Sequence, residues 1–268
     1  MSTSPIIRYT SFPTGTIAFS TTRHGGVSTG AYNSLNCTPY TGDNTGHVRL
    51  NQEILCNILP QRPKELVIPF QTHGTESVVI DDTYLQASKE ERHARLQGID
   101  ALITREPDIC LCISTADCIP ILLYDKQHRI AAAIHAGWRG TVNRIVLRTL
   151  KRMHTLYGTE GKEVAAVIGP GISLPAFEVG EEVYEAFHQQ GFPMEHISKW
   201  NAETHKHHID LLGANRLQLL DFGLFSTQVE TAGICTFTQH EDFFSARRLG
   251  IHSGRILSGI MLTSIIHN

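Results

Sequence analysis

Three apolar runs in the middle of the chain restrict the fold more than any other feature of the sequence. They occupy residues 109–114, 120–124 and 130–135. Continuous apolar runs of this length are typical of strands that are buried on both faces. A polar turn at residues 125–128 separates the last two runs, so we predict a hairpin within a buried sheet. Residues 141–157 then carry apolar side chains at helical spacing, and Gly158 marks the end of that helix.

The rest of the chain alternates between strand and helix patterns. Further strands are predicted at residues 16–20, 66–68, 77–80, 164–168 and 231–236, and an apolar run extends over residues 256–266. Further helices are predicted at residues 44–59, at 179–190 before Gly191, and from the capping residue Asp210 to Phe222 before Gly223. Residues 81–97 are charged and poor in aliphatic side chains, which indicates a surface excursion. Because no linker or composition break divides the chain, we expect one α+β domain over residues 1–268.

The charge balance and the cysteines limit the functional classes. The formal net charge is −3, so the chain lacks the basic footprint that nucleic-acid backbones require. The sequence shows neither a secretion signal nor an apolar segment long enough to cross a bilayer. Six cysteines without a secretion signal indicate reduced thiols rather than disulfides. We therefore expect a cytoplasmic protein that binds neither nucleic acid nor membranes.

Two histidines and a cysteine are candidate metal ligands. Cys118 enters the first strand of the predicted hairpin and His135 leaves the second, so antiparallel pairing would bring them together. His73 lies in a polar segment between two predicted strands and can approach them from an adjacent element. One thiolate and two imidazoles suit zinc or copper, and three protein ligands leave a fourth coordination place for water or substrate. The alternative for each histidine is a hydrogen-bonded structural role.

Two arginine-containing segments are candidate anion sites. Residues 137–140 join a predicted strand to a predicted helix, where free N–H groups, the helix dipole and Arg139 would favour a phosphate. The alternative is a tight turn with Arg139 in solvent. Residues 243–248 and 254–255 place three arginines beside two phenylalanines, which could bind phosphate and stack a flat ring. The alternative is a core pair of phenylalanines with solvated arginines.

The sequence gives less support for a functional role of four other residues. Asp117 adjoins Cys118 and is a candidate to orient a histidine or to act as an acid or base. Glu178 precedes a predicted helix, where a capping role is expected. Cys110 and Cys112 place both sulfurs on one face of a strand, where we expect them to be buried as small apolar side chains.

Many of these residues fall in a series of ordered motifs. The motifs are 22–28 (TRHGGVS), 34–36 (SLN), 42–43 (GD), 71–74 (QTHG), 115–120 (TADCIP), 135–140 (HAGWRG), 168–170 (IGP), 177–180 (FEVG), 214–216 (ANR) and 243–248 (FFSARR). Over nearly the whole chain this series resembles the YfiH family, also called the laccase-domain or multicopper polyphenol oxidase family. The Ala-Asp-Cys and His-Ala-Gly-Trp-Arg-Gly motifs are its most specific parts. The resemblance implies a mixed β-sheet layered with helices into an α/β sandwich.

The resemblance also implies zinc-dependent chemistry on a purine nucleoside and phosphate. It assigns the zinc to His73, Cys118 and His135, with copper as the other candidate metal. The implied reactions are phosphorolysis of adenosine, inosine and methylthioadenosine to a free base and a sugar 1-phosphate, and deamination of adenosine. The predicted catalytic residues are Cys118, His135, Asp117 and Arg139. The predicted substrate- and phosphate-binding residues are Arg23, Arg139, Phe244, Arg247 and Arg248.

The sequence departs from many family members at Gly171, Ala176 and Thr238, where cysteines often occur. These departures weaken the case for a multi-copper cluster and leave the three zinc ligands intact. Three other functions remain open. They are a copper-dependent oxidase of phenols, a metal-free hydrolase or amidase with Cys118 as nucleophile and His135 as base, and a non-catalytic metal-binding or scaffold protein.

Overall fold

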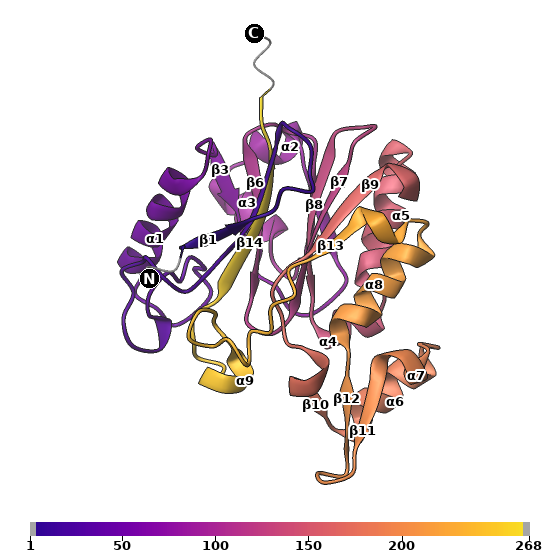
Figure 1. Cartoon of the computed structure of the whole chain (residues 1–268). Helices are drawn as coiled ribbons and strands as arrows, with labels where there is room; N and C mark the ends of the chain where they lie inside the picture. Colours follow the sequence, from indigo (N-terminus) through magenta and orange to yellow (C-terminus); the bar gives the residue numbers. More distant parts are fainter. Residues whose placement is uncertain (1–3, 265–268) are drawn as a thin grey trace.

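Two β-sheets face each other at the centre of the molecule, and helices cover the outer face of each (Figure 1). The structure is a computed structural model that describes residues 4–264. The five-stranded sheet has the order β1 (Ile6–Arg8), β2 (Thr16–Thr21), β14 (Ile256–Leu262), β6 (Ile109–Thr115) and β3 (Glu65–Val67). The six-stranded sheet has the order β13 (Val229–Thr231), β9 (Val164–Ile168), β7 (Ile119–Asp125), β8 (Ile130–Ala136), β5 (Ala101–Thr104) and β4 (Ser77–Ile80). Both sheets combine parallel and antiparallel pairs, which confirms the predicted mixed-sheet α/β sandwich.

The helices form the two outer layers and a small projection. Helix α1 (Thr45–Ile58) packs on the five-stranded sheet, and α5 (Ile145–Tyr157) and α8 (Leu211–Asp221) pack on the six-stranded sheet. A three-stranded sheet of β10 (Glu178–Val179), β12 (Lys206–Ile209) and β11 (Ser198–Asn201) projects from this body with α6 (Glu181–Gln189) and α7 (Met194–Ile197) (Figure 1). The short helices are α2 (Asp82–Leu85), α3 (Lys89–Arg95), α4 (Trp138–Val142) and α9 (Ala246–Leu249).

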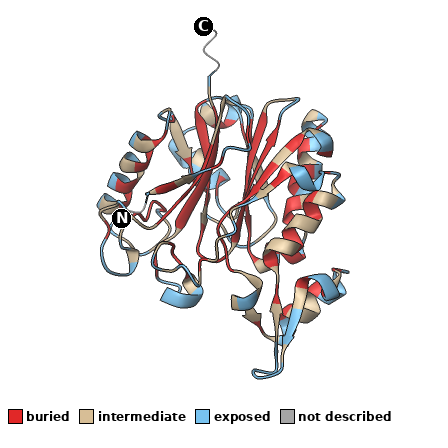
Figure 2. Cartoon of the chain, in the orientation of Figure 1, coloured by how far each residue is buried: buried red, intermediate tan, exposed pale blue. Residues whose placement is uncertain are grey.

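Alternating side chains explain why the central strands are apolar without interruption. In β6, Leu111 and Ile113 belong to the core between the two sheets, whereas Cys110 and Cys112 belong to the core under α1. Strands β7 and β8 repeat this pattern, with one set of side chains between the sheets and the other against α5 and α8. Figure 2 shows the resulting buried centre. The prediction that Cys110 and Cys112 are buried on one face is confirmed.

The hairpin and most of the other predicted elements are confirmed. Strands β7 and β8 pair antiparallel. The side chains of Asn44 and Asp210 cap α1 and α8 through hydrogen bonds from backbone amides. Glu178 does not cap α6, because it lies in β10 and its carboxylate pairs with Lys206. Strand β14 ends at Leu262, and residues 265–266 of the predicted apolar run lie outside the described residues.

Three predicted elements differ from the structure. The helix predicted at residues 141–157 is two helices, α4 and α5, because Arg144 has a left-handed backbone with φ of 62° that interrupts it. The strand predicted at residues 231–236 lies earlier, as β13, where it pairs in parallel with β9. The excursion at residues 81–97 contains α2 and α3 and is anchored by the buried Tyr84. The sequence pattern does not predict β1, β5, β11 and β12, each only three or four residues long.

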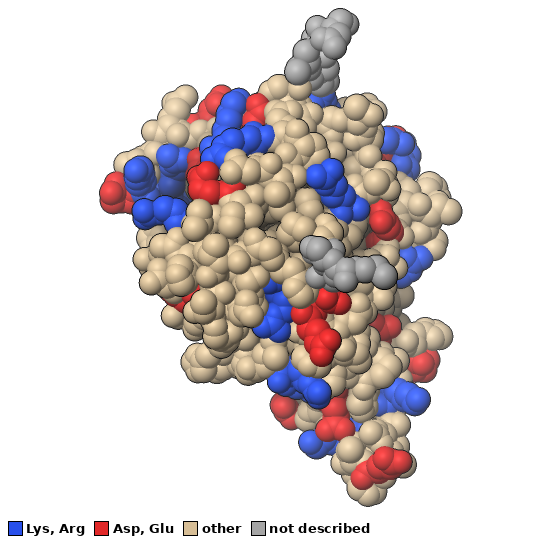
Figure 3. All heavy atoms as spheres, turned by 60° about the vertical axis from the view of Figure 1, so that its left-hand side comes forward, with Lys and Arg blue, Asp and Glu red and all other residues tan. Residues whose placement is uncertain are grey.

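The surface carries both signs of charge. Figure 3 shows basic and acidic side chains interspersed over one face of the molecule. All six cysteines are free. Among residues 4–264, no helix has both the length and the apolar character that a membrane span requires.

Asn51 of α1 fixes the loop that follows β2. It is fully buried, and its Nδ2 donates hydrogen bonds to Oγ of Ser28 and to the carbonyls of Ser34 and Asn36. Its Oδ1 accepts a hydrogen bond from the amide of Val27. One side chain therefore satisfies four polar groups of a loop that has little regular structure of its own.

The substitution Asn51→Leu keeps a similar volume and removes these hydrogen bonds. Because the amide of Val27 and the carbonyl of Asn36 would lose their partners, we expect the free energy of unfolding to fall by about 2–4 kcal/mol. Chemical denaturation measures this change. Asn57→Leu, on the exposed side of the same helix, is the matched control, and it should cost less than about 1 kcal/mol. If the two variants lose the same free energy of unfolding, the buried hydrogen bonds of Asn51 do not stabilise the loop as described.

Candidate metal centre

Two of the links by which the chain crosses between the two sheets reach the end of β8. Cys118 lies in the short link from β6 to β7, which belong to different sheets. His73 lies in the link from β3 to β4, which also belong to different sheets. His135 is near the end of β8 and is paired with Pro120, two residues beyond Cys118. The hairpin therefore brings Cys118 and His135 together, as predicted.

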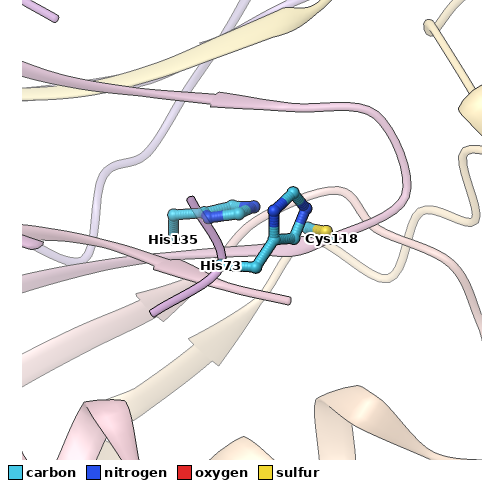
Figure 4. Close-up of side chains that lie close together, drawn as sticks. All are labelled: His73, Cys118 and His135. Carbon is cyan, nitrogen blue, oxygen red and sulfur yellow. The ribbon is translucent and has the colours of Figure 1, made fainter. Parts of the chain in front are cut away.

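His73, Cys118 and His135 converge in space (Figure 4). Their candidate ligand atoms all lie within 4.8 Å of one another, and the two imidazole rings meet edge to face with centroids 4.8 Å apart. His135 is buried, Cys118 is half-buried and His73 is exposed. Two nitrogens and one sulfur suit zinc or copper and leave a coordination place free. Among residues 4–264, no other group of His, Cys, Asp and Glu side chains has the spacing of a metal site.

The fully buried carboxylate of Asp100 connects to both histidines. Its Oδ1 lies 2.7 Å from Nδ1 of His135. The amides of Thr72, His73 and Gly74 also donate hydrogen bonds to it, at 3.2, 3.0 and 2.7 Å. Burial acts to raise the pKa of Asp100, but the hydrogen bond and charge of His135 and the amide hydrogen bonds outweigh it and lower the pKa. Sequence reasoning misses Asp100, because its role depends on three segments that are far apart in the chain.

Cys118 and His135 stabilise each other's charged forms. Burial acts to raise the pKa of Cys118, but the charge of His135 and hydrogen bonds from both histidines lower it to about 6. Burial acts to lower the pKa of His135, but the Cys118 thiolate and Asp100 raise it to about 9. Without metal, the thiolate of Cys118 and the imidazolium of His135 therefore favour each other. A metal ion that binds here must displace the proton from His135.

Two residues of this region have left-handed backbones, His73 with φ of 62° and Asp117 with φ of 89°. Such conformations cost roughly 1–3 kcal/mol in residues other than glycine and persist where their surroundings fix them. The carboxylate of Asp117 accepts hydrogen bonds from Oγ1 of Thr236 at 2.7 Å and from the amide of Arg247 at 2.6 Å. The prediction that Asp117 orients a histidine is therefore wrong, because the carboxylate beside His135 is Asp100.

Gly137 leaves room for the candidate ligands. A Cβ atom at this position would lie 2.8 Å from Cδ2 of His73 and 3.1 Å from Sγ of Cys118. The first contact is shorter than real Cβ atoms show, so a side chain here would displace the imidazole. The glycine that opens residues 137–140 thus serves the packing of the metal centre.

A cavity of about 320 Å³ reaches the three side chains. Small-molecule sites span roughly 300–1,000 Å³, so the cavity is at the lower end of that range. Its wall includes the rings of Tyr40 and Phe70, which pack edge to face with centroids 5.2 Å apart. Among the described residues that line it, Arg255 is the only lysine or arginine. The hydroxyl oxygens of Ser114 and Thr115 are buried in the same lining, and neither has a hydrogen-bond partner among the described residues.

Three of the predicted substrate-binding arginines are exposed and lie outside the cavity lining. They are Arg139, Arg247 and Arg248, whose guanidinium groups lie over the rings of Trp138, Phe177 and Phe237 respectively. The structure therefore favours the solvated alternative for each of them. Arg255, from the same arginine-rich region, is the one that reaches the cavity.

Arg23 and Phe244 also lie outside the cavity lining. The guanidinium of Arg23 donates hydrogen bonds to the carbonyls of Asn33 and His240 and lies 5.0 Å from the ring centroid of Phe244. Phe244 is fully buried, and the backbone of Gly254 packs directly against its ring. This ring has no free face for a ligand, so it belongs to the core.

The substitution Gly137→Ala should weaken metal binding at least tenfold, about 1.4 kcal/mol, because the new methyl group displaces His73 and Cys118. Zinc titration of the metal-free protein against a chromogenic chelator measures the affinity. The matched control is Gly74→Ala, since a Cβ there would make only ordinary contacts, the nearest at 3.4 Å from Asp100. If both variants bind zinc as the unsubstituted protein does, the crowding argument fails.

Known proteins resemble this chain over most of its length. A family model described as multi-copper polyphenol oxidoreductase laccase matches residues 17–263. A purine nucleoside phosphorylase of Bacteroides thetaiotaomicron is 62% identical over 244 residues, which cover 91% of this chain and 90% of that protein. Adenosine deaminase RL5, from an unknown prokaryotic organism, is 41% identical and covers 92% of this chain and 94% of its own.

Solved structures share the fold as well. The crystal structure of the hypothetical protein YfiH from Bacillus licheniformis superimposes with a TM-score of 0.85 at 28% sequence identity, covering 92% of this chain and 93% of that one. The region that the family model matches contains the six-stranded sheet, most of the five-stranded sheet and all three candidate metal ligands. The chain therefore belongs to the YfiH family, whose model is described as multi-copper polyphenol oxidoreductase laccase.

Proposed function

We propose that this protein is a zinc-dependent enzyme of purine nucleosides. It would split adenosine, inosine and methylthioadenosine with phosphate into a free base and a sugar 1-phosphate, and it would also deaminate adenosine. The observation that carries the proposal is the convergence of His73, Cys118 and His135 at a cavity of ligand size. The relatives named purine nucleoside phosphorylase and adenosine deaminase support it.

The donor set fits zinc. Catalytic zinc sites have three protein ligands from cysteine, histidine and carboxylate side chains, and they keep a fourth place for water or substrate. Bound zinc supplies an activated water by lowering its pKa to near neutral. Of the chain's own groups, Asp100 holds the proton on Nδ1 of His135, so Nε2 is the nitrogen left to face the metal. The lowered pKa of Cys118 favours the thiolate that metal binding requires.

The cavity walls fit the other parts of a nucleoside. Tyr40 and Phe70 offer flat apolar surface for a purine base. Phosphorolysis passes through an oxocarbenium-like sugar and needs a phosphate held beneath the anomeric carbon. Arg255 supplies the cation for this task. Its Nη1 and Nη2 donate hydrogen bonds to the carbonyls of residues 251, 253 and 254, while its Nε has no partner among the described residues.

A metal-free cysteine hydrolase is the second candidate function. The lowered pKa of Cys118 beside His135 favours it, because this is the charge state of an activated nucleophile. A multi-copper oxidase has less support, since oxygen reduction needs further coppers and residues 4–264 hold a single candidate metal group. We also propose that the chain is one catalytic domain, because two of its candidate ligands lie in links that join the two sheets, and that it acts in the cytoplasm.

Adenosine turnover with and without phosphate tests the proposed function. We expect adenine and ribose 1-phosphate only when phosphate is present, and inosine in both conditions. Removing the metal with a chelator or substituting His73→Ala should abolish both products, and zinc should restore them only to the unsubstituted protein. Chromatography of the products measures this outcome. A protein that forms neither product, or one that is insensitive to chelators and inactivated by alkylation of Cys118, would contradict the proposal.

The substitution Arg255→Gln separates the two reactions. A charge-assisted hydrogen bond contributes about 1.5–3 kcal/mol, so the KM for phosphate should rise by roughly 10- to 100-fold. Deamination uses no phosphate and should keep its rate, which also reports that the variant is folded. Arg247→Gln, outside the cavity, is the control and should leave the KM for phosphate unchanged. If Arg247→Gln has the larger effect, the phosphate site has been placed wrongly.

A further inference from the structure

The amides of Thr72, His73 and Gly74 converge on Asp100. Three successive N–H groups can point toward one place because His73 has a left-handed backbone. Such an arrangement forms an anion-binding concavity, and here the anion is a side chain of the same protein. The position of the His73 backbone therefore depends on the negative charge of Asp100.

Asp100 also determines which nitrogen of His135 carries a proton. An ionised carboxylate can only accept hydrogen bonds, so Nδ1 of His135, at 2.7 Å, must be the donor. In the neutral imidazole, Nε2 is then the nitrogen with a free lone pair. The backbone amide of His135 in addition donates to the carbonyl of Asp100 at 2.8 Å. One buried residue thus fixes the proton, the ring and the main chain of His135.

We propose that Asp100 is the positioning residue of the metal centre, which keeps Nε2 of His135 free for the metal while it holds the loop of His73 in place. This inference rests on the metal-dependent function proposed above. Asp100 lies outside the cavity lining, so it acts through the two histidines and does not contact substrate.

Asparagine at this position would move the proton of the neutral His135 imidazole from Nδ1 to Nε2. Its side chain has one accepting oxygen and one donating NH₂ group. With the oxygen toward Thr72 and Gly74, the NH₂ group meets one opposing donor, the amide of His73. The opposite rotamer would meet two opposing donors, the amides of Thr72 and Gly74, so the first is favoured. In that rotamer the NH₂ group donates to Nδ1 of His135, and the proton moves to Nε2, where it blocks the metal.

Asp125 offers a matched control. It is fully buried, like Asp100, and it accepts hydrogen bonds from Nδ1 of His128 at 2.9 Å and from two backbone amides of its own turn. It lies at the end of β7 opposite to Cys118. Asp125→Asn therefore makes the same chemical change in a comparable hydrogen-bond arrangement far from the candidate ligands.

The test is a double-mutant cycle on zinc affinity. Zinc is titrated into the metal-free protein against a chromogenic chelator for Asp100→Asn, His135→Gln, the double variant and Asp125→Asn. We expect Asp100→Asn to weaken binding roughly 10- to 100-fold and Asp125→Asn to change it less than about twofold. Because Asp100 acts in part through His135, the loss of zinc affinity in the double variant should be smaller than the sum of the two single losses. Unchanged affinity in Asp100→Asn, or fully additive effects, would overturn the proposal.

A measurement on the unsubstituted protein covers the case in which Asp100→Asn does not fold. Nitrogen NMR of the zinc-loaded protein, with His135 assigned through His135→Gln, should show a proton on Nδ1 and a metal on Nε2. A proton on Nε2, or ligation through Nδ1, would overturn the proposal. None of these measurements uses a nucleoside. A protein that binds zinc in this way and turns over no nucleoside would therefore refute the proposed function and leave the role of Asp100 intact.

Discussion

Burial of both faces of the central strands is the constraint on which the rest of the structure depends. Strands β6, β7 and β8 place alternate side chains between the two sheets and against the outer helices. The side chains on these strands, apart from the half-buried Ser114, are therefore shielded from water, and the apolar area removed contributes about 25 cal/mol per Å². Strands β3 and β4, and likewise β6 and β7, are consecutive in the chain but belong to different sheets, so the chain crosses between the sheets in the links that join them. The candidate metal centre lies where two of these links meet the end of β8.

The metal centre gains its geometry from these crossings. Residues 116–118 span the two sheets with one left-handed residue, Asp117, whose carboxylate is fixed by Thr236 and Arg247. The link that carries His73 is held by the carboxylate of Asp100, which would be costly to bury without its four hydrogen bonds. The thiolate of Cys118 and the imidazolium of His135 compensate each other in the same way. Polar groups in this buried region are thus arranged as a connected set.

The sequence predicts the convergence of Cys118 and His135 because their contact is nearly local. A hairpin with a short turn fixes which ends of its strands meet, and β7 and β8 pair in this way. His73 is separated from them by a change of sheet, and its place in the centre follows from the family resemblance. The placements of Phe244 and the arginines were harder to predict, because a phenylalanine beside arginines is compatible with a core position and with a binding site. Burial alone separates the two cases.

The sequence by itself determined the central hairpin through its apolar periodicity, and its resemblance to the YfiH family gave the layered α/β class and the full set of candidate ligands. Only the tertiary structure decided that Asp100 supports both histidines, that Gly137 leaves space beside them and that Arg255 is the arginine that reaches the cavity. Each of these roles depends on contacts between segments that are far apart in the chain. Their positions are set by how the two sheets pack, and no local pattern in the sequence records that packing.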